Sequence, residues 1–114
     1  MKVENMSNQI VTKNFFGAVL DIIAENTSTN YSIVAVNGIK GQLSEQFKFL
    51  RNVYIKDSTI EVSDNINSVG KNELKRFFIE AINMMGPNYL KVLLSRRLDQ
   101  KDLAYLEDIG IRFG

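Results

Sequence analysis

The densest group of side chains that could do chemistry lies near the C-terminus. Its four carboxylates could bind a hard cation or transfer protons. They are Asp99, Asp102, Glu107 and Asp108. Because basic residues surround these acids, as on an ordinary solvated helix face, we interpret the group as protein surface and predict no metal site.

The chain lacks the residues that most kinds of catalytic chemistry require. The chain of 114 residues contains no Cys and no His. Thiolate nucleophiles, disulfides, Cys-rich zinc sites and Ser-His-Asp triads are therefore excluded. Gly38 and Gly41 are not followed by the Gly-Lys-Ser/Thr of a phosphate-binding loop. We expect a protein that is not an enzyme and that uses no cofactor or small-molecule substrate.

Basic residues form a second group with possible function. The net charge is only +1, from 14 Lys and Arg against 13 Asp and Glu. Residues 71–101 nevertheless hold seven basic and three acidic side chains, a local charge of +4 against −3 elsewhere. Clustered Lys and Arg can contact nucleic-acid phosphates, although a solvated helix face explains the same composition.

The composition is that of one globular domain. Apolar residues make up 45% and charged residues 24% of the chain, which is ordinary for such proteins. Without a linker or repeat, we expect residues 1–114 to form a single domain. No signal-peptide pattern or long apolar run is visible, so a cytoplasmic protein with no membrane contact is expected.

Two β-hairpins are predicted in the middle of the chain. Asn37-Gly38 is typical of a type I′ turn, which needs positive φ at both central residues, and would join strands 31–36 and 39–43. A second turn at Asp57-Ser58 puts the apolar residues of its strands on one face. The pairs it predicts are Lys56 with Thr59, Ile55 with Ile60, and Val53 with Val62. Residues 44–50 extend this meander or form a helical turn.

An amphipathic helix follows the hairpins. Its apolar residues recur with the spacing of one helix face. They are Leu74, Phe77, Phe78, Ala81, Ile82 and Met85. Ser68 is a candidate cap for its start, and Gly86-Pro87 is expected to end it.

Three apolar segments are less clear. Residues 9–16 are interpreted as an entering strand and 18–25 as a short helix, although periodicity alone does not settle the division. Residues 89–94 fit either a buried strand or the start of a helix. The last segment, 103–113, is equally open.

The order of these segments resembles one protein family. Residues 36–43 (Val-Asn-Gly-Ile-Lys-Gly-Gln-Leu) are similar to Val-Asn-Gly-Lys-x-Gly-Asn-Leu in a eukaryote-specific ribosomal protein, number twenty-two of the large subunit. Residues 59–64 stand where that family has Ile-Thr-Val-Thr-Ser. Residues 70–75 stand at its Ser-Lys-Arg-Tyr-Leu-Lys helix start, and 88–93 at its Asp-Trp-Leu-Arg-Val-Val. The collinear order over residues 10–95 carries the resemblance.

The resemblance implies a fold. Residues 89–94 would be a strand, and another strand would end the chain. The expected class is α+β: an antiparallel or mixed sheet built on the two central hairpins, with two or three helices packed on one face. A helical C-terminal third would count against the family. The sequence also departs from it, because Ile79, Glu80, Asn83 and Met84 stand where the family's helix carries paired lysines.

The resemblance also implies a function. The protein would be a structural constituent of the cytosolic large ribosomal subunit, binding rRNA beside neighbouring ribosomal proteins. Lys71, Lys75 and Arg76 match the family's basic helix and Lys91 matches its Arg, while charge alone suggests the other contacts. The full predicted RNA-binding set is Lys40, Arg51, Lys56, Lys71, Lys75, Arg76, Lys91, Arg96 and Arg97.

Two other classes of function remain open. The first is a protein-interaction module without nucleic-acid binding, which the near-neutral charge favours. Its contact surface would be the exposed edge of the meander or the corner at Met84 and Met85. The second is a small-ligand or regulatory domain, for which the sequence offers no convergent set of polar residues.

Overall fold

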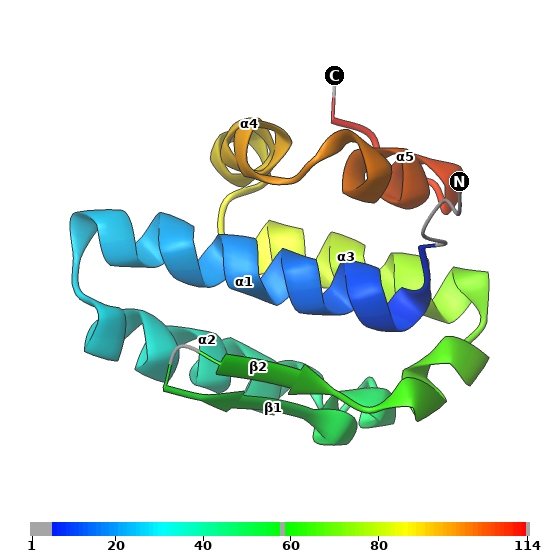
Figure 1. The fold of residues 1–114 in the computed structure, drawn as a ribbon, viewed down its shortest axis with the longest axis horizontal. Coiled ribbons are helices and arrows are strands. Elements are labelled where there is room, and N and C mark those ends of the chain that lie inside the picture. The colour runs from blue at the N-terminus through cyan, green and yellow to red at the C-terminus, as the bar shows by residue number, and fades with distance from the viewer. Residues whose placement is uncertain (1–5, 58, 114) are drawn as a thin grey trace, which may run out of the picture.

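A computed structural model describes residues 6–57 and 59–113, and it is 73% helical. The elements are α1 (Asn8–Asn26), α2 (Thr29–Leu43), the 3-10 turn η1 (Lys48–Asn52), β1 (Val53–Lys56), β2 (Thr59–Val62), the 3-10 turn η2 (Asp64–Ser68), α3 (Lys71–Met84), α4 (Pro87–Arg97) and α5 (Gln100–Asp108). They form layers (Figure 1). Helices α1 and α3 lie in the middle, α4 and α5 cover one side, and α2 covers the other with the β1–β2 hairpin.

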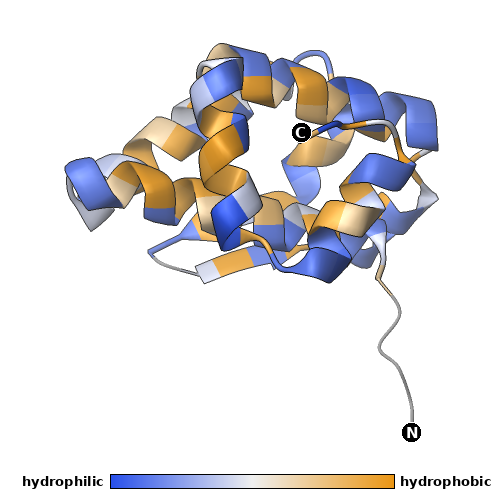
Figure 2. Cartoon of the chain, turned by 90° about the horizontal axis from the view of Figure 1, so that it is seen from above, coloured by the Kyte–Doolittle hydropathy of each residue, from blue (hydrophilic) through white to orange (hydrophobic). Residues whose placement is uncertain are grey.

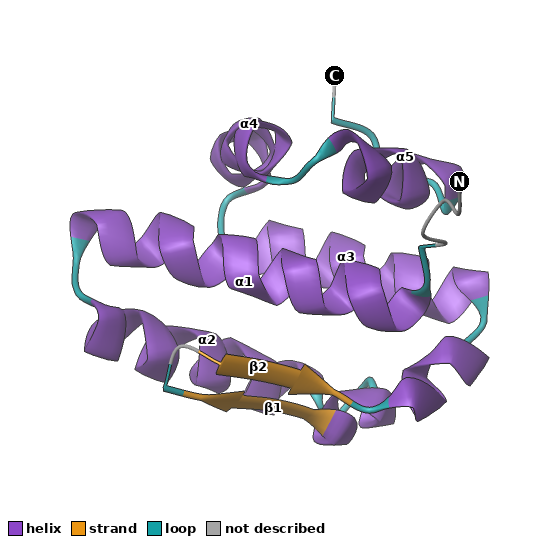
Figure 3. Cartoon of the chain, viewed as in Figure 1, coloured by secondary structure: helices purple, strands orange, loops and turns teal. Residues whose placement is uncertain are grey.

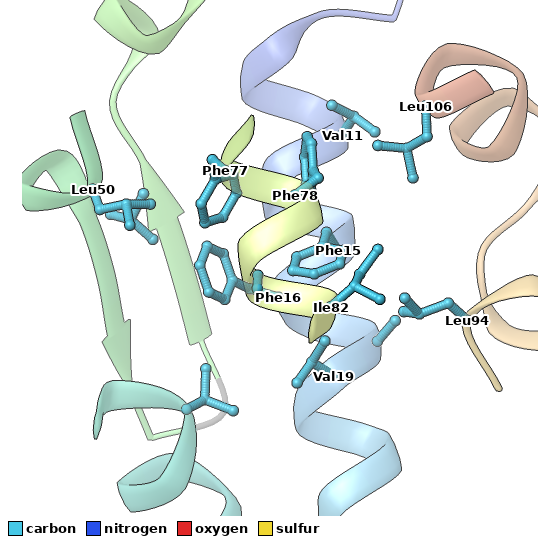
Figure 4. Close-up of a cluster of buried hydrophobic side chains, with 14 of the residues drawn as sticks. Val11, Phe15, Phe16, Val19, Leu50, Phe77, Phe78, Ile82, Leu94 and Leu106 are labelled. Carbon is cyan, nitrogen blue, oxygen red and sulfur yellow. The ribbon is translucent and has the colours of Figure 1, made fainter. Parts of the chain in front are cut away.

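The middle layer is joined by phenylalanines. Phe15 of α1 contacts Phe78 of α3 edge-on, with ring centroids 4.9 Å apart. Phe77 makes a similar contact with Phe47, at 5.9 Å, which connects α3 to the chain between α2 and the hairpin. These four rings and Phe16 are at most 2% exposed. Figure 4 shows the rings of α1 and α3 gathered in one cluster. Truncating one such ring to Ala typically costs about 3–5 kcal/mol.

Helix α1 corrects the prediction of a strand at 9–16 followed by a helix at 18–25. One helix runs from Asn8 to Asn26, and the Ser7 hydroxyl at its N-cap accepts a hydrogen bond from the Ile10 amide. The helix contacts α2 and β2 on one side and α4 and α5 on the other. Because both sides are apolar, its sequence does not show the single stripe that marks a surface helix.

The hairpin predicted at Asn37-Gly38 is wrong. Residues 31–36 and 39–43 belong to one helix, α2, which Ser28 caps by accepting from the Tyr31 amide. The Asn37 amide group donates to the carbonyls of Ile33 and Ile55. Burial of the helix face that contains Val36 and Leu43 outweighs the local turn preference of Asn-Gly.

The second hairpin is confirmed in the predicted register. Val53 pairs with Val62, Ile55 with Ile60, and Lys56 with Thr59. Asp57 has the positive φ of a tight turn, at 54°, and Ser58 lies outside the described residues. Figure 3 shows this hairpin beside helices.

The predicted α+β fold class is therefore wrong. In the described residues the only sheet is this two-stranded one, and not a sheet built on two hairpins. Residues 44–50 do not extend the meander: they form a turn and the start of η1, in line with the helical alternative. Segments with strong β signals thus became helix or turn wherever helical packing buried their apolar residues.

The C-terminal third is helical. Helix α3 is confirmed and ends before Gly86-Pro87, but Gly70, not Ser68, occupies its N-cap position. Pro87 begins α4, since proline suits the first turn of a helix. The strand implied at 89–94 is wrong: these residues belong to α4, on which Leu90 and Leu94, four residues apart, are buried on one face.

Up to residue 113, where the described part of the chain ends, no strand follows α5 either. Asp99 caps α5, which runs to Asp108, and residues 111–113 have no regular structure. Asn8 fixes α5 to the start of α1, because its side chain accepts from the Tyr105 hydroxyl. The same side chain donates to the carbonyls of Ile66 and Val69. This buried amide thus joins α1, η2 and α5.

Gly38→Ala distinguishes the helix from the predicted hairpin. A Cβ at Gly38 meets nothing within 4 Å, so the variant should gain about 0.5–1 kcal/mol of unfolding free energy from helix propensity. Urea unfolding measures the gain. Gly110→Ala is the control expected to destabilise, because Gly110 has φ +109° and Lys75 lies against it. If Gly38→Ala were less stable than the wild type, the result would support the predicted turn at Asn37-Gly38 and contradict helix α2.

Candidate functional site

The structure separates the C-terminal carboxylates. Asp99 accepts a hydrogen bond from the Asp102 amide, 3.0 Å away, as the N-cap of α5. Asp108 forms an exposed ion pair with Lys71, also at 3.0 Å. Among residues 6–57 and 59–113, no three acidic side chains gather as metal ligands would.

Asp102 differs from the other three acids because it is buried, at 3% exposure. The Asn14 amide group donates to its Oδ1, 3.0 Å away. Removal from water raises the pKa of the Asp102 carboxyl; the Asn14 hydrogen bond opposes this shift, and the charge of Asp99 adds to it. The spacing of the acidic residues along the chain does not indicate this burial.

A groove of about 500 Å³ opens beside Asp102, between α1 and the turn from α4 to α5. Its charged lining is mixed: Lys13, Asp21, Arg97, Asp99 and Asp102. Arg97 also forms an ion pair with Glu25, which does not line the groove. A perturbed carboxyl in a groove is a common feature of functional sites. Here three acidic side chains face two basic ones, and Arg97 is already paired, so the groove has no cluster of free cations for an anion.

Some of the predicted RNA-binding residues contact other residues of the same chain. The Lys40 ammonium donates to the Val53 carbonyl, 2.6 Å away, and burial lowers the pKa of Lys40. The Arg76 guanidinium lies 5.7 Å from the centre of the Phe47 ring. With Lys71 and Arg97 in ion pairs, these residues already have partners.

The predicted RNA-binding residues are spread over all three layers. Arg51 and Lys56 lie on the side of α2 and the hairpin, and Arg96 lies on α4. Lys91 lines a second groove, and Lys75 lies beside Gly110 at its border. The groove also contains Arg112, which was not among the predicted residues because it lies outside the basic segment 71–101.

Exposed apolar side chains form a separate kind of candidate. Tyr31 and Val34 on α2 are 57% and 70% exposed, and Tyr54 on β1 is 55% exposed. Tyr89 and Val92 on α4 have the same spacing as the α2 pair. Figure 2 shows that hydrophobic and hydrophilic residues alternate along the helices.

Compared with known proteins, the chain matches no family model, no curated protein and no solved structure. The ribosomal resemblance therefore stays a prediction. No helix in the described part of the chain has the length and apolar character to cross a membrane.

Asp102→Asn tests the buried carboxyl. Because the pKa of Asp102 in the folded protein lies above 3.8, its ionisation costs stability. As the pH rises from 3.8 to the pKa of Asp102 in the folded protein, the wild type should lose stability relative to Asp102→Asn. Above that pKa, the difference in unfolding free energy between the two proteins should stay constant. Urea unfolding at about pH 3 and about pH 7 measures it. Glu45→Gln controls for loss of an exposed carboxylate. A difference independent of pH would contradict the burial.

Proposed function

We propose that this protein is a protein-interaction module that binds its partner through the outer surface of α2 and the hairpin. We name this surface the α2–hairpin face and define it by Tyr31, Val34, Gly38, Gly41 and Tyr54. The observation that carries the proposal is the exposure of Tyr31, Val34 and Tyr54, each more than half accessible. Exposed tyrosines are frequent at the energetic centres of protein interfaces.

The charge of α2 supports this choice. Lys40 is the only charged residue between Thr29 and Leu43, and its ammonium is bound to the Val53 carbonyl of the hairpin. The outer surface of α2 therefore presents no charge. Because interface centres are depleted of charged residues, a partner can bury this surface without desolvating an ion.

The partner is expected to contact side chains and not to add a strand. On β1, the carbonyls of Val53 and Ile55 already accept from Lys40 and Asn37. On β2, the Val62 carbonyl accepts from the Gln9 amide group, 2.8 Å away. Strand addition needs free edge groups. These contacts disfavour the meander edge as the binding surface.

The other surface considered for a partner lies near Met84 and Met85. Met84 is 42% exposed, while Met85 is partly buried against the core. On the adjoining α4, Tyr89 and Val92 are exposed, but Arg96 follows them on the same helix face and is exposed as well. The α2 part of the α2–hairpin face lacks such a charge, and this difference favours it; charged side chains adjoin the face at Tyr54, where Lys56 and Glu61 are exposed on the hairpin.

Ribosomal binding is the weaker alternative. The family resemblance implied strands in the C-terminal third, but this part of the chain forms α4 and α5. Several of the expected phosphate contacts already have partners within the protein. Sedimentation of the endogenous protein with large ribosomal subunits, lost as salt rises, would favour rRNA binding over our proposal.

Two matched double variants test the face. Tyr31→Ser with Val34→Ser alters α2, and Tyr89→Ser with Val92→Ser makes the same change on α4. Each of these substitutions should change the free energy of unfolding by no more than about 0.5 kcal/mol, since the positions are exposed. Quantitative mass spectrometry of proteins that co-purify with the tagged chain should show a partner lost about tenfold or more from the α2 variant only.

Other outcomes contradict the proposal. A partner lost only from the α4 variant would move the binding surface to α4. A set of partners unchanged in both variants would exclude both surfaces.

A further inference from the structure

The second groove lies between α3, α4 and the chain that follows α5. Its volume is about 310 Å³, which is at the small end for ligand pockets. The residues that line it are Ile79, Ile82, Asn83, Lys91, Gly110, Ile111 and Arg112. It is separate from the α2–hairpin face, so a ligand here does not depend on the proposed function.

The polar part of the lining is basic. Lys91 and Arg112 line the groove, and no acidic side chain does. Lys75 adds a third cation: a Cβ built on Gly110 would lie 2.9 Å from Lys75 Nζ. Glycine at position 110 therefore gives the Lys75 ammonium its place beside the groove.

None of these three cations is neutralised within the described part of the chain. The ion pairs found there involve Lys71 with Asp108 and Arg97 with Glu25. Lys75 and Lys91 are only partly accessible to water. Ammonium and guanidinium groups bind carboxylates and phosphates through charge-assisted hydrogen bonds. The groove thus has an unmet preference for negative charge.

The rest of the lining is apolar. Ile82 and Ile111 are each 2% exposed and close the groove toward the core, while Ile79 is 37% exposed. A fully hydrated inorganic anion would leave these side chains unused. A ligand with an anionic head and a short hydrocarbon part would contact the cations and cover Ile79, above the floor that Ile82 and Ile111 form.

We propose that this groove binds a small amphipathic anion, with a carboxylate or phosphate head held by Lys75, Lys91 and Arg112 and an apolar part against Ile79, Ile82 and Ile111. The charge supplies orientation, and the volume limits the ligand to a short chain.

Octanoate and hexyl phosphate are the probes, and titration followed by amide NMR shifts is the measurement. Saturable shifts are expected at Ile82, Gly110 and Ile111. Hexanol and inorganic phosphate, which each supply one half of the ligand, should bind about tenfold more weakly or worse. Equal affinity for hexanol, equal affinity for inorganic phosphate, or no saturable shift with either probe would each overturn the proposal.

The charge is tested by Lys91→Gln with Arg112→Gln, which should weaken octanoate binding about tenfold or more. Lys48→Gln with Lys101→Gln removes the same total charge from exposed positions outside the groove and should leave the affinity unchanged. Amide spectra of the free variants verify that both fold. If both double variants lost octanoate affinity equally, the anion would be attracted by the net charge of the protein alone, and the proposed site would be wrong.

Discussion

The contact between the phenylalanines of α1 and α3 is the interaction on which the remaining structure depends. Phe15 and Phe78 join the two helices of the middle layer, and Phe77 reaches Phe47 on the side of the hairpin. On the opposite side, Leu94 and Leu106 of the outer helices point toward the same cluster (Figure 4). Each outer layer is thus packed against the middle one. Losing the middle layer would leave neither outer layer with a core.

This arrangement determines which elements could be predicted from the sequence. Helix α3 carries a regular apolar stripe, and the strands of the Asp57 hairpin alternate in burial, so local pattern and final structure agree. Helix α1 is apolar on two sides, which removes the periodic signal. In α2, the local preference of Asn37-Gly38 for a turn lost to the burial of Val36 and Leu43. On α4, the family resemblance implied a strand where leucines four residues apart form a buried face.

The candidate sites depended even more on tertiary structure. Lys40 looks like an exposed cation in the sequence, yet it binds the hairpin backbone. Arg112 is distant in sequence from Lys91, and only the chain after α5 brings both to one groove. Tyr31 and Val34 could have been noticed, because apolar residues three apart on a helix share a side. The assumption that residues 31–36 form a strand concealed that relationship.

Native-state hydrogen exchange tests the account most directly, because it ranks the stability of the elements without altering them. If the phenylalanine contact supports both outer layers, the amides of α1 and α3 will exchange slowest, and only through global unfolding. The amides of α2, the hairpin, α4 and α5 will exchange through smaller openings. Slowest exchange in α2 or the hairpin, with α1 opening first, would contradict the central role of the middle layer.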